Sequence, residues 1–151
     1  MPQSLANMLV HLIFSTEDRR PFIRDEIRGE LHAYCAGIFK ACQSPSLIIN
    51  SRPEHAHALF SLSKNWSLAD VVEEVKKGSS KWIKSKGYEY RDFYWQGGYG
   101  AYALSEDDKE DVIRYIANQE AHHREVLFQD ELCTLFDLNG VEYDERYLWS
   151  K

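Results

Sequence analysis

The stretch 53-PEHAHALF-60 places two histidines on either side of one alanine and continues into an apolar run. In a β-strand, successive side chains point to opposite faces, so His55 and His57 would share one face, about 6.6 Å apart at Cα. Two imidazoles at that spacing can bind one metal ion, while Ala56 turns to the other face. The same pattern is equally typical of a half-buried strand with two surface histidines. Other parts of the sequence are therefore needed to distinguish a metal-binding pair from such a strand.

The segments around this strand alternate between strand and helix patterns. Hydrophobic periodicity predicts strands over residues 5–15, 47–50, 55–62 and 99–104, and helices over residues 24–43, 68–86, 106–123 and 125–138. The first six elements follow the order β-α-β-β-α-β of ferredoxin-like folds. The predicted fold class is therefore α+β, ferredoxin-like, with a four-stranded antiparallel sheet, two helices on one face and additional C-terminal helices.

Composition is that of an ordinary globular chain. With 151 residues, 44% of them hydrophobic and 28% charged, the sequence predicts one domain over residues 1–151. No apolar run approaches the length of a membrane span, and no signal-peptide pattern is visible, which predicts a cytoplasmic protein. The three cysteines lack metal-ligand spacing, and we interpret Cys35, Cys42 and Cys133 as small buried hydrophobic residues in a reducing compartment.

Charge is unevenly distributed. The formal net charge is −6, yet residues 64–91 hold 7 basic and 4 acidic side chains, whereas residues 105–151 hold 5 basic and 13 acidic ones. The acidic total argues mildly against a nucleic-acid partner, but the basic segment keeps one open.

A polar stripe marks the predicted helix 106–123. Tyr115 and Gln119 are four residues apart and therefore lie on one helix face, which helical spacing extends to His122. Taken alone, such a stripe is more typical of a solvated helix face than of a site.

Five segments together resemble a known family. They are 10-VHLIFST-16, 53-PEHAHALF-60, 76-KKGSSKW-82, 95-WQGGYGAY-102 and 115-YIANQEAHH-123. In this order, and over almost the whole chain, they resemble the IS200/IS605-type single-tyrosine "HUH" transposases, which include the REP-associated enzymes. HUH stands for His–hydrophobe–His, here His55-Ala56-His57. The resemblance assigns residues 1–104 to the ferredoxin-like core and residues 105–151 to the nucleophile helix and C-terminal tail.

The resemblance implies a chemistry for these residues. Tyr115 would attack a phosphodiester of single-stranded DNA, forming a 5′-phosphotyrosine link and releasing a 3′-hydroxyl. His55, His57 and Gln119 would hold a divalent metal ion, Mg²⁺ or Mn²⁺, which polarises the phosphate. Asn118 and His122 would have structural roles.

The resemblance also implies partners. The substrate would be DNA hairpins at the ends of a mobile element, with phosphate contacts from Lys76, Lys77 and Lys81. A solvated helix face explains these lysines equally well. The family acts as homodimers in which the tyrosine helix of one subunit serves the histidine pair of the other, so Tyr115 and Gln119 would complete the site in trans. The net charge of −6 departs from the basic character typical of the family.

Three alternatives remain open on sequence alone. A domesticated relative that binds or nicks hairpin DNA without moving an element would keep the same residues. A zinc hydrolase of the His-x-His-x-Asp-His type would need an acid and a histidine where residues 58–60 are Ala, Leu and Phe. A non-catalytic ferredoxin-like binding module would lack a metal site beside Tyr115.

Overall fold

The sheet confirms the predicted topology. The computed structural model describes residues 2–123 and 126–144. The four strands are β1 (Leu9–Ser15), β2 (Ser46–Arg52), β3 (His55–Ser61) and β4 (Gly100–Leu104), in the order β2-β3-β1-β4 with every neighbouring pair antiparallel.

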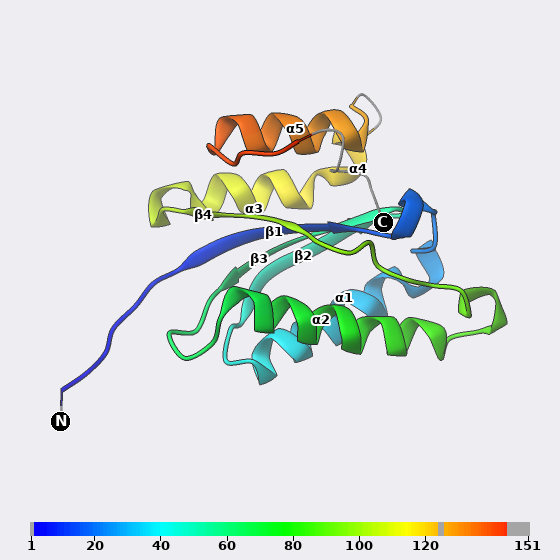
Figure 1. Cartoon of the computed structure of the whole chain (residues 1–151), viewed down its shortest axis with the longest axis horizontal. Coiled ribbons are helices and arrows are strands. Elements are labelled where there is room, and N and C mark those ends of the chain that lie inside the picture. Colours follow the sequence, from blue (N-terminus) through cyan, green and yellow to red (C-terminus); the bar gives the residue numbers. More distant parts are fainter. Residues whose placement is uncertain (1, 124–125, 145–151) are drawn as a thin grey trace.

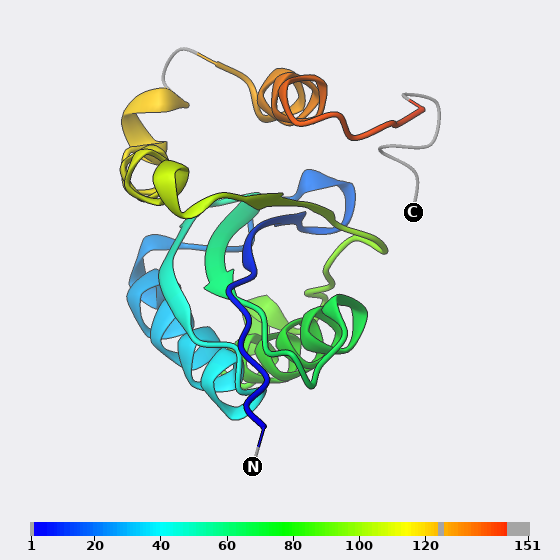
Figure 2. The same ribbon diagram turned by 90° about the vertical axis from the view of Figure 1, so that its left-hand side faces the viewer.

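Helices cover both faces of this sheet. One face carries α1 (Asp25–Ala41) and α2 (Leu68–Lys84), and the other carries α3 (Lys109–Ala117), α4 (Gln119–His122) and α5 (Phe128–Leu138) (Figures 1 and 2). The α1/α2 layer is the pair of helices that a ferredoxin-like fold predicts. Among the described helices, none combines the length and the apolar character that a membrane crossing requires.

Burial on both faces explains the long apolar runs of the central strands. Leu12, Phe14 and Phe60 belong to the main core under α1 and α2, together with Ala56 and Ala58. The intervening residues of β1 and β3 face α3–α5, so every residue of β1 is buried. A strand covered on both faces loses the polar alternation of a half-exposed strand.

Contacts account for the start of one helix and test the prediction made for the cysteines. The Ser67 side chain accepts a hydrogen bond from the Asp70 backbone N–H at 3.0 Å, so Ser67 is the N-cap of α2. Cys35 and Cys42 are buried in the main core as predicted, and burial raises the pKa of the Cys35 thiol to about 12. The prediction is wrong for Cys133 on α5, which is only partly buried.

The predicted helix over residues 106–123 is broken. A 3₁₀ turn (Glu106–Asp108) precedes α3, and Asn118 (φ −95°, ψ 20°) separates α3 from α4. The Asn50 side chain of β2 donates a hydrogen bond to the Ile116 carbonyl at 2.8 Å, so a strand residue, rather than the next helical turn, satisfies the end of α3.

The other boundaries differ in smaller ways. The first strand begins at Leu9 rather than at residue 5, and α5 begins at Phe128 rather than at residue 125, which lies outside the described residues. The predicted end at residue 138 is confirmed: α5 ends at Leu138, and Asn139 and Gly140 (φ 69°) follow it. Of the acidic, aromatic tail, residues 145–151 also lie outside the described part.

Candidate active site

The histidine pair lies where strand alternation predicts. His55 and His57 point from β3 to the α3–α5 side, whereas Ala56 joins the core on the opposite side. Both histidines are fully buried, with ring centroids 5.1 Å apart. This excludes the interpretation of a half-buried strand with two surface histidines.

A polar partner holds one nitrogen of each ring. His55 Nδ1 lies 2.8 Å from a carboxylate oxygen of Glu54. His57 Nδ1 lies 2.8 Å from Nε2 of His11, whose own Nδ1 lies 2.5 Å from the Tyr102 hydroxyl. These contacts fix the ring orientations and turn both Nε2 atoms towards α5, as outer partners do for metal-binding histidines.

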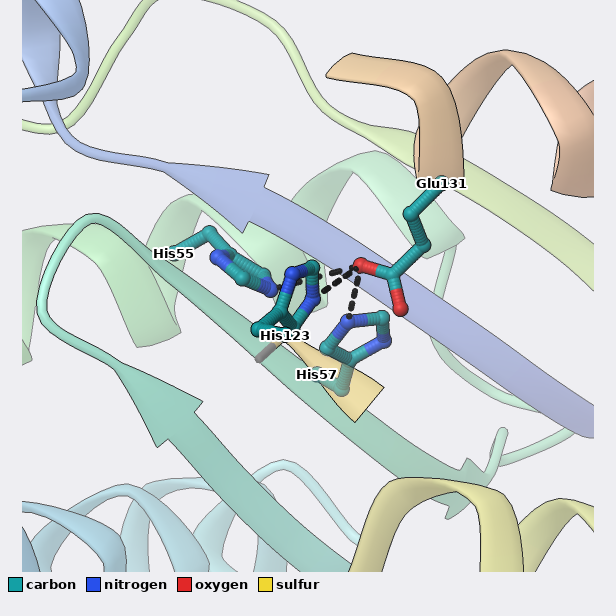
Figure 3. A group of neighbouring side chains, drawn as sticks. All are labelled: His55, His57, His123 and Glu131. Atoms are coloured by element: carbon teal, nitrogen blue, oxygen red, sulfur yellow. Dashed lines mark hydrogen bonds and ion pairs between the residues drawn. The ribbon is translucent and has the colours of Figure 1, made fainter. Parts of the chain in front are cut away.

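A buried carboxylate from α5 faces these nitrogens. Oε1 of Glu131 lies 3.4 Å from His55 Nε2, 3.2 Å from His57 Nε2 and 2.8 Å from His123 Nε2 (Figure 3). Burial alone would raise the pKa of Glu131, but the hydrogen bonds of the three histidines outweigh it and hold this pKa well below its usual range. Glu131 is therefore an anion in the centre of the site.

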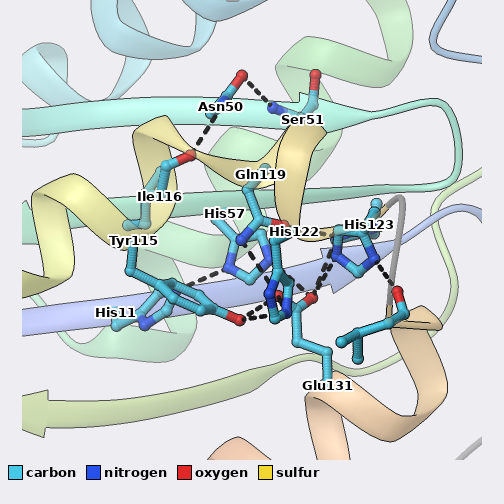
Figure 4. A network of polar contacts seen from close by, with 12 residues as sticks. His11, Asn50, Ser51, His57, Tyr115, Ile116, Gln119, His122, His123 and Glu131 are labelled. Carbon is cyan, nitrogen blue, oxygen red and sulfur yellow. Dashed lines mark hydrogen bonds and ion pairs between the residues drawn. The ribbon is translucent and has the colours of Figure 1, made fainter.

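Tyr115 reaches the same carboxylate. Its hydroxyl donates to the second oxygen of Glu131, Oε2, and lies 3.4 Å from His122 Nε2 (Figure 4). Its ring lies against His57, with centroids 5.9 Å apart. Burial, together with the hydrogen bond and charge of Glu131, raises the pKa of the Tyr115 phenol, so the hydroxyl keeps its proton at neutral pH.

Gln119 joins the site across the break at Asn118. Its side chain is fully buried, with Oε1 3.3 Å from His55 Nε2 and Nε2 donating to Glu131 Oε2 at 3.1 Å. Tyr115, Gln119 and the histidine pair thus converge within one chain, although the continuous helix that the sequence predicted is absent from the described residues 106–123.

The three predicted DNA-binding lysines lie away from this cluster. All are on α2, which packs on the opposite face of the sheet (Figure 1). Lys77 and Lys81 are exposed, whereas Lys76 is half-buried and donates to the backbone carbonyls of Gln96 and Gly98. Burial lowers the pKa of Lys76 to about 8. The contacts of Lys76 are those of a residue that anchors the 96–98 loop.

Sequence reasoning assigned no role to Glu131 or His123. Glu131 lies in the apolar stripe of α5, beside Phe128, Leu132 and Phe136. An acidic residue at such an inward position is the sequence feature that could have pointed to a site residue. His123 was part of the quoted motif. With His55 and His57, they form a group whose possible ligand atoms all lie within 4.8 Å of one another. Imidazole nitrogens and a carboxylate are suitable ligands for a divalent metal ion.

A cavity borders Phe128, whose ring stacks on His55 with centroids 4.0 Å apart. It has a volume of about 400 Å³ and lies between β1, the 96–101 segment and α5, with Phe128, Phe136, Tyr99 and Tyr143 among its lining residues. Aromatic walls of this kind can receive a nucleobase.

Comparison with known proteins identifies the family. The family model described as "Transposase IS200 like" matches residues 4–119. The chain belongs to the IS200-like transposase family. The matched part of the transposase contains both HUH histidines, Tyr115 and Gln119, and it ends before α5. The family resemblance of the sequence is thereby confirmed.

Two solved structures share the fold of this transposase. A candidate transposase from Deinococcus radiodurans R1 is 21% identical, with a TM-score of 0.61 over 79% of this chain and 98% of that chain. A REP-associated tyrosine transposase bound to a REP hairpin is 15% identical, with a TM-score of 0.61 over 83% of this chain and 74% of that chain. No curated protein matches the chain.

Proposed function

We propose that this transposase cleaves and rejoins single-stranded DNA at hairpin-containing element ends through a 5′-phosphotyrosine intermediate on Tyr115. The observation that carries the proposal is the convergence, in one buried cluster, of the Tyr115 hydroxyl with His55, His57 and Gln119. A solvated helix face would leave Tyr115 pointing into solvent, and a binding module would have no reason to bury two histidines beside it.

The covalent step exchanges one ester bond for another. The Tyr115 oxygen attacks the phosphorus, the bond from phosphorus to the 3′ oxygen breaks, and this oxygen leaves as a 3′-hydroxyl with a proton from water. The phenol proton has two acceptors within reach, Glu131 Oε2 and His122 Nε2.

The donor atoms present suit a divalent metal ion. The Nε2 atoms of His55 and His57 and the amide oxygen of Gln119 point into the same buried space. A bound Mg²⁺ or Mn²⁺ would supply Lewis-acid polarisation of the phosphate. The contacts of His55 with Glu54 and of His57 with His11 keep the rings oriented for that role.

Hairpin DNA as the substrate is supported by two features. One solved structure with this fold is bound to a REP hairpin. The cavity lined by Phe128 and Phe136 offers room for an unpaired base, and the exposed Lys77 and Lys81 offer phosphate contacts on another face. A cytoplasmic location belongs to the same proposal.

We further propose a homodimer in which exchange of α3 between subunits brings Tyr115 to the partner's histidine pair. In the described chain, Tyr115 meets its own His57. Mixed dimers of Tyr115→Phe and His57→Ala subunits test the exchange: recovery of cleavage supports it, and complete inactivity refutes it.

The cleavage experiment uses single-stranded DNA with the hairpins that border the gene, incubated with purified protein and Mn²⁺. A covalent protein–DNA adduct is expected, and Tyr115→Phe should abolish it. Tyr94→Phe is the matched control because Tyr94 is exposed. Absence of an adduct across all bordering hairpins contradicts the proposal and favours a binding module. Adducts without strand joining favour a nicking protein that no longer moves an element.

A further inference from the structure

We propose that His123 and Glu131 are ligands of the same metal ion as His55, His57 and the amide oxygen of Gln119, so that the site of this chain includes three imidazoles and one carboxylate. The inference rests on the proposed metal dependence of the transposase and adds two ligands to it. Glu131 belongs to α5, which lies beyond the family-matched residues 4–119. The two added ligands are therefore a property of this chain and do not follow from the family match.

The first argument is convergence. Three Nε2 atoms, from His55, His57 and His123, lie 2.8–3.4 Å from the same oxygen, Oε1 of Glu131. The possible ligand atoms of the four residues all lie within 4.8 Å of one another, and three of the residues are almost fully buried. Exposed acidic clusters are common on proteins, but a buried carboxylate ringed by imidazoles needs an electrostatic explanation.

The second argument concerns which ring nitrogen of each histidine carries the hydrogen. The Val126 carbonyl, 2.7 Å from His123 Nδ1, can only accept, so His123 Nδ1 carries a hydrogen. His55 Nδ1 faces the Glu54 carboxylate in the same way. A neutral ring in this tautomer offers the lone pair of Nε2 to a metal ion, and both Nε2 atoms lie within 3.4 Å of Glu131 Oε1.

His57 completes the pattern. Its Nδ1 can donate a hydrogen bond to His11 Nε2, and His11 Nδ1 can in turn donate one to the Tyr102 hydroxyl. His57 Nε2 also lies 3.2 Å from Oε1 of Glu131, so its lone pair is available to the same ion. One divalent cation between these four atoms would bind three imidazoles and the carboxylate at once.

Gln119 also contacts the second oxygen of the Glu131 carboxylate, Oε2. Its amide nitrogen donates to Glu131 Oε2, which also accepts from the Tyr115 hydroxyl. These two contacts leave Oε1 for the cation and orient the carboxylate, as outer hydrogen bonds do in metal sites.

The ligand set selects the kind of metal. Imidazole ligands suit first-row transition metals, whereas Mg²⁺ prefers oxygen ligands and keeps several waters. Three histidines and one glutamate are therefore expected to bind Zn²⁺ and Mn²⁺ well and Mg²⁺ poorly.

The test measures metal affinity without DNA. Zn²⁺ is titrated into the metal-free full chain in competition with a chromophoric chelator, for wild type, His57→Ala, Glu131→Gln and His123→Asn. Asp130→Asn is the matched control because Asp130 is the exposed neighbour of Glu131 on α5. Losing an outer partner of a metal site typically lowers affinity about 10–100-fold, so each of the three site variants is expected to lose at least about 100-fold, and Asp130→Asn nothing.

The outcomes separate this inference from the proposed function. If His57→Ala loses affinity while Glu131→Gln and His123→Asn bind Zn²⁺ as the wild type does, the added ligands are refuted and the HUH site stands. If His57→Ala also binds as the wild type does, the proposed metal site itself is refuted. Thermal unfolding without metal checks that each variant folds; if Glu131→Gln does not, His123→Asn decides the question. A Co²⁺ absorption spectrum that differs between wild type and His123→Asn is the expected sign of a ligand, and identical spectra would count against it.

Discussion

Gly100 is the position at which β4 allows α5 to lie close to the sheet. A Cβ added at Gly100 would lie 2.5 Å and 2.6 Å from two ring atoms of Phe136 and 3.5 Å from Leu132 Cδ1. Carbon atoms in contact normally lie about 3.5–4.0 Å apart, so Gly100→Ala requires a displacement of about 1 Å. Phe136 is buried, and overpacking of this kind costs about 1–3 kcal/mol. We expect this substitution to weaken the packing of α5 against the sheet.

Hydrogen exchange measures this local cost. A loss of about 1–3 kcal/mol corresponds to about 5–150-fold faster exchange of α5 amides, with the amides of β1 and β3 unchanged. Gly97→Ala is the matched control because nothing lies within 4 Å of its added Cβ. Both substitutions reduce the conformational entropy of the unfolded chain to a similar extent, so their comparison cancels this effect. Equal α5 exchange in the two variants, or faster exchange throughout the sheet in Gly100→Ala, would refute the reasoning.

Three further variants test separate contacts. Asn50→Ala removes the hydrogen bond to the Ile116 carbonyl, costs about 0.5–1.5 kcal/mol and should slow single-turnover adduct formation; a wild-type rate would show that this contact does not position the nucleophile. Ser79→Ala leaves the Trp95 indole N–H without its acceptor at 2.9 Å, which should cost about 1–3 kcal/mol and lower Tm by about 2–4 °C per kcal/mol; an unchanged melting curve contradicts this. Burial lowers the pKa of His32 from 6.5 to about 4. Between pH 6.5 and 4 the imidazole is therefore protonated in the unfolded chain but not in the folded chain, and the free energy of unfolding decreases as the pH falls through this range. His32→Gln should make Tm less dependent on pH in that window, and an equally steep decrease argues against the assignment.

The sequence predicted features whose causes are local. Strand alternation was enough to place His55 and His57 on one face and Ala56 on the other. The order of helix and strand patterns was enough for the ferredoxin-like sheet. Ser67 could be identified as an N-cap because its partner, the Asp70 N–H, lies three residues away.

Features set by contacts between distant segments could not be predicted. The break at Asn118 depends on Asn50, more than 60 residues earlier, which satisfies the end of α3. In the sequence, Glu131 is one of many acidic residues in the C-terminal region. Its role becomes visible only in the fold, where α5 lies over the histidine pair. Its inward position is visible only once Phe128, Leu132 and Phe136 are known to pack on the sheet.

The burial of the site constrains how DNA can reach it. His55, His57 and Gln119 are each 0% exposed, so a phosphodiester can approach them only after part of their cover has moved. Among the described residues, two elements provide that cover. The α3–α4 segment carries Tyr115 and Gln119, which cleavage needs beside the histidines, whereas α5 carries Glu131, whose carboxylate contacts the Nε2 atoms of His55 and His57. A metal ion between Glu131 and the histidines would offset the repulsion between this carboxylate and an incoming phosphate. Of the two covering elements, α5 carries no residue proposed for the covalent step, and its Phe136 packs closely against Gly100 of β4, so this contact bears on how a phosphodiester reaches the histidines.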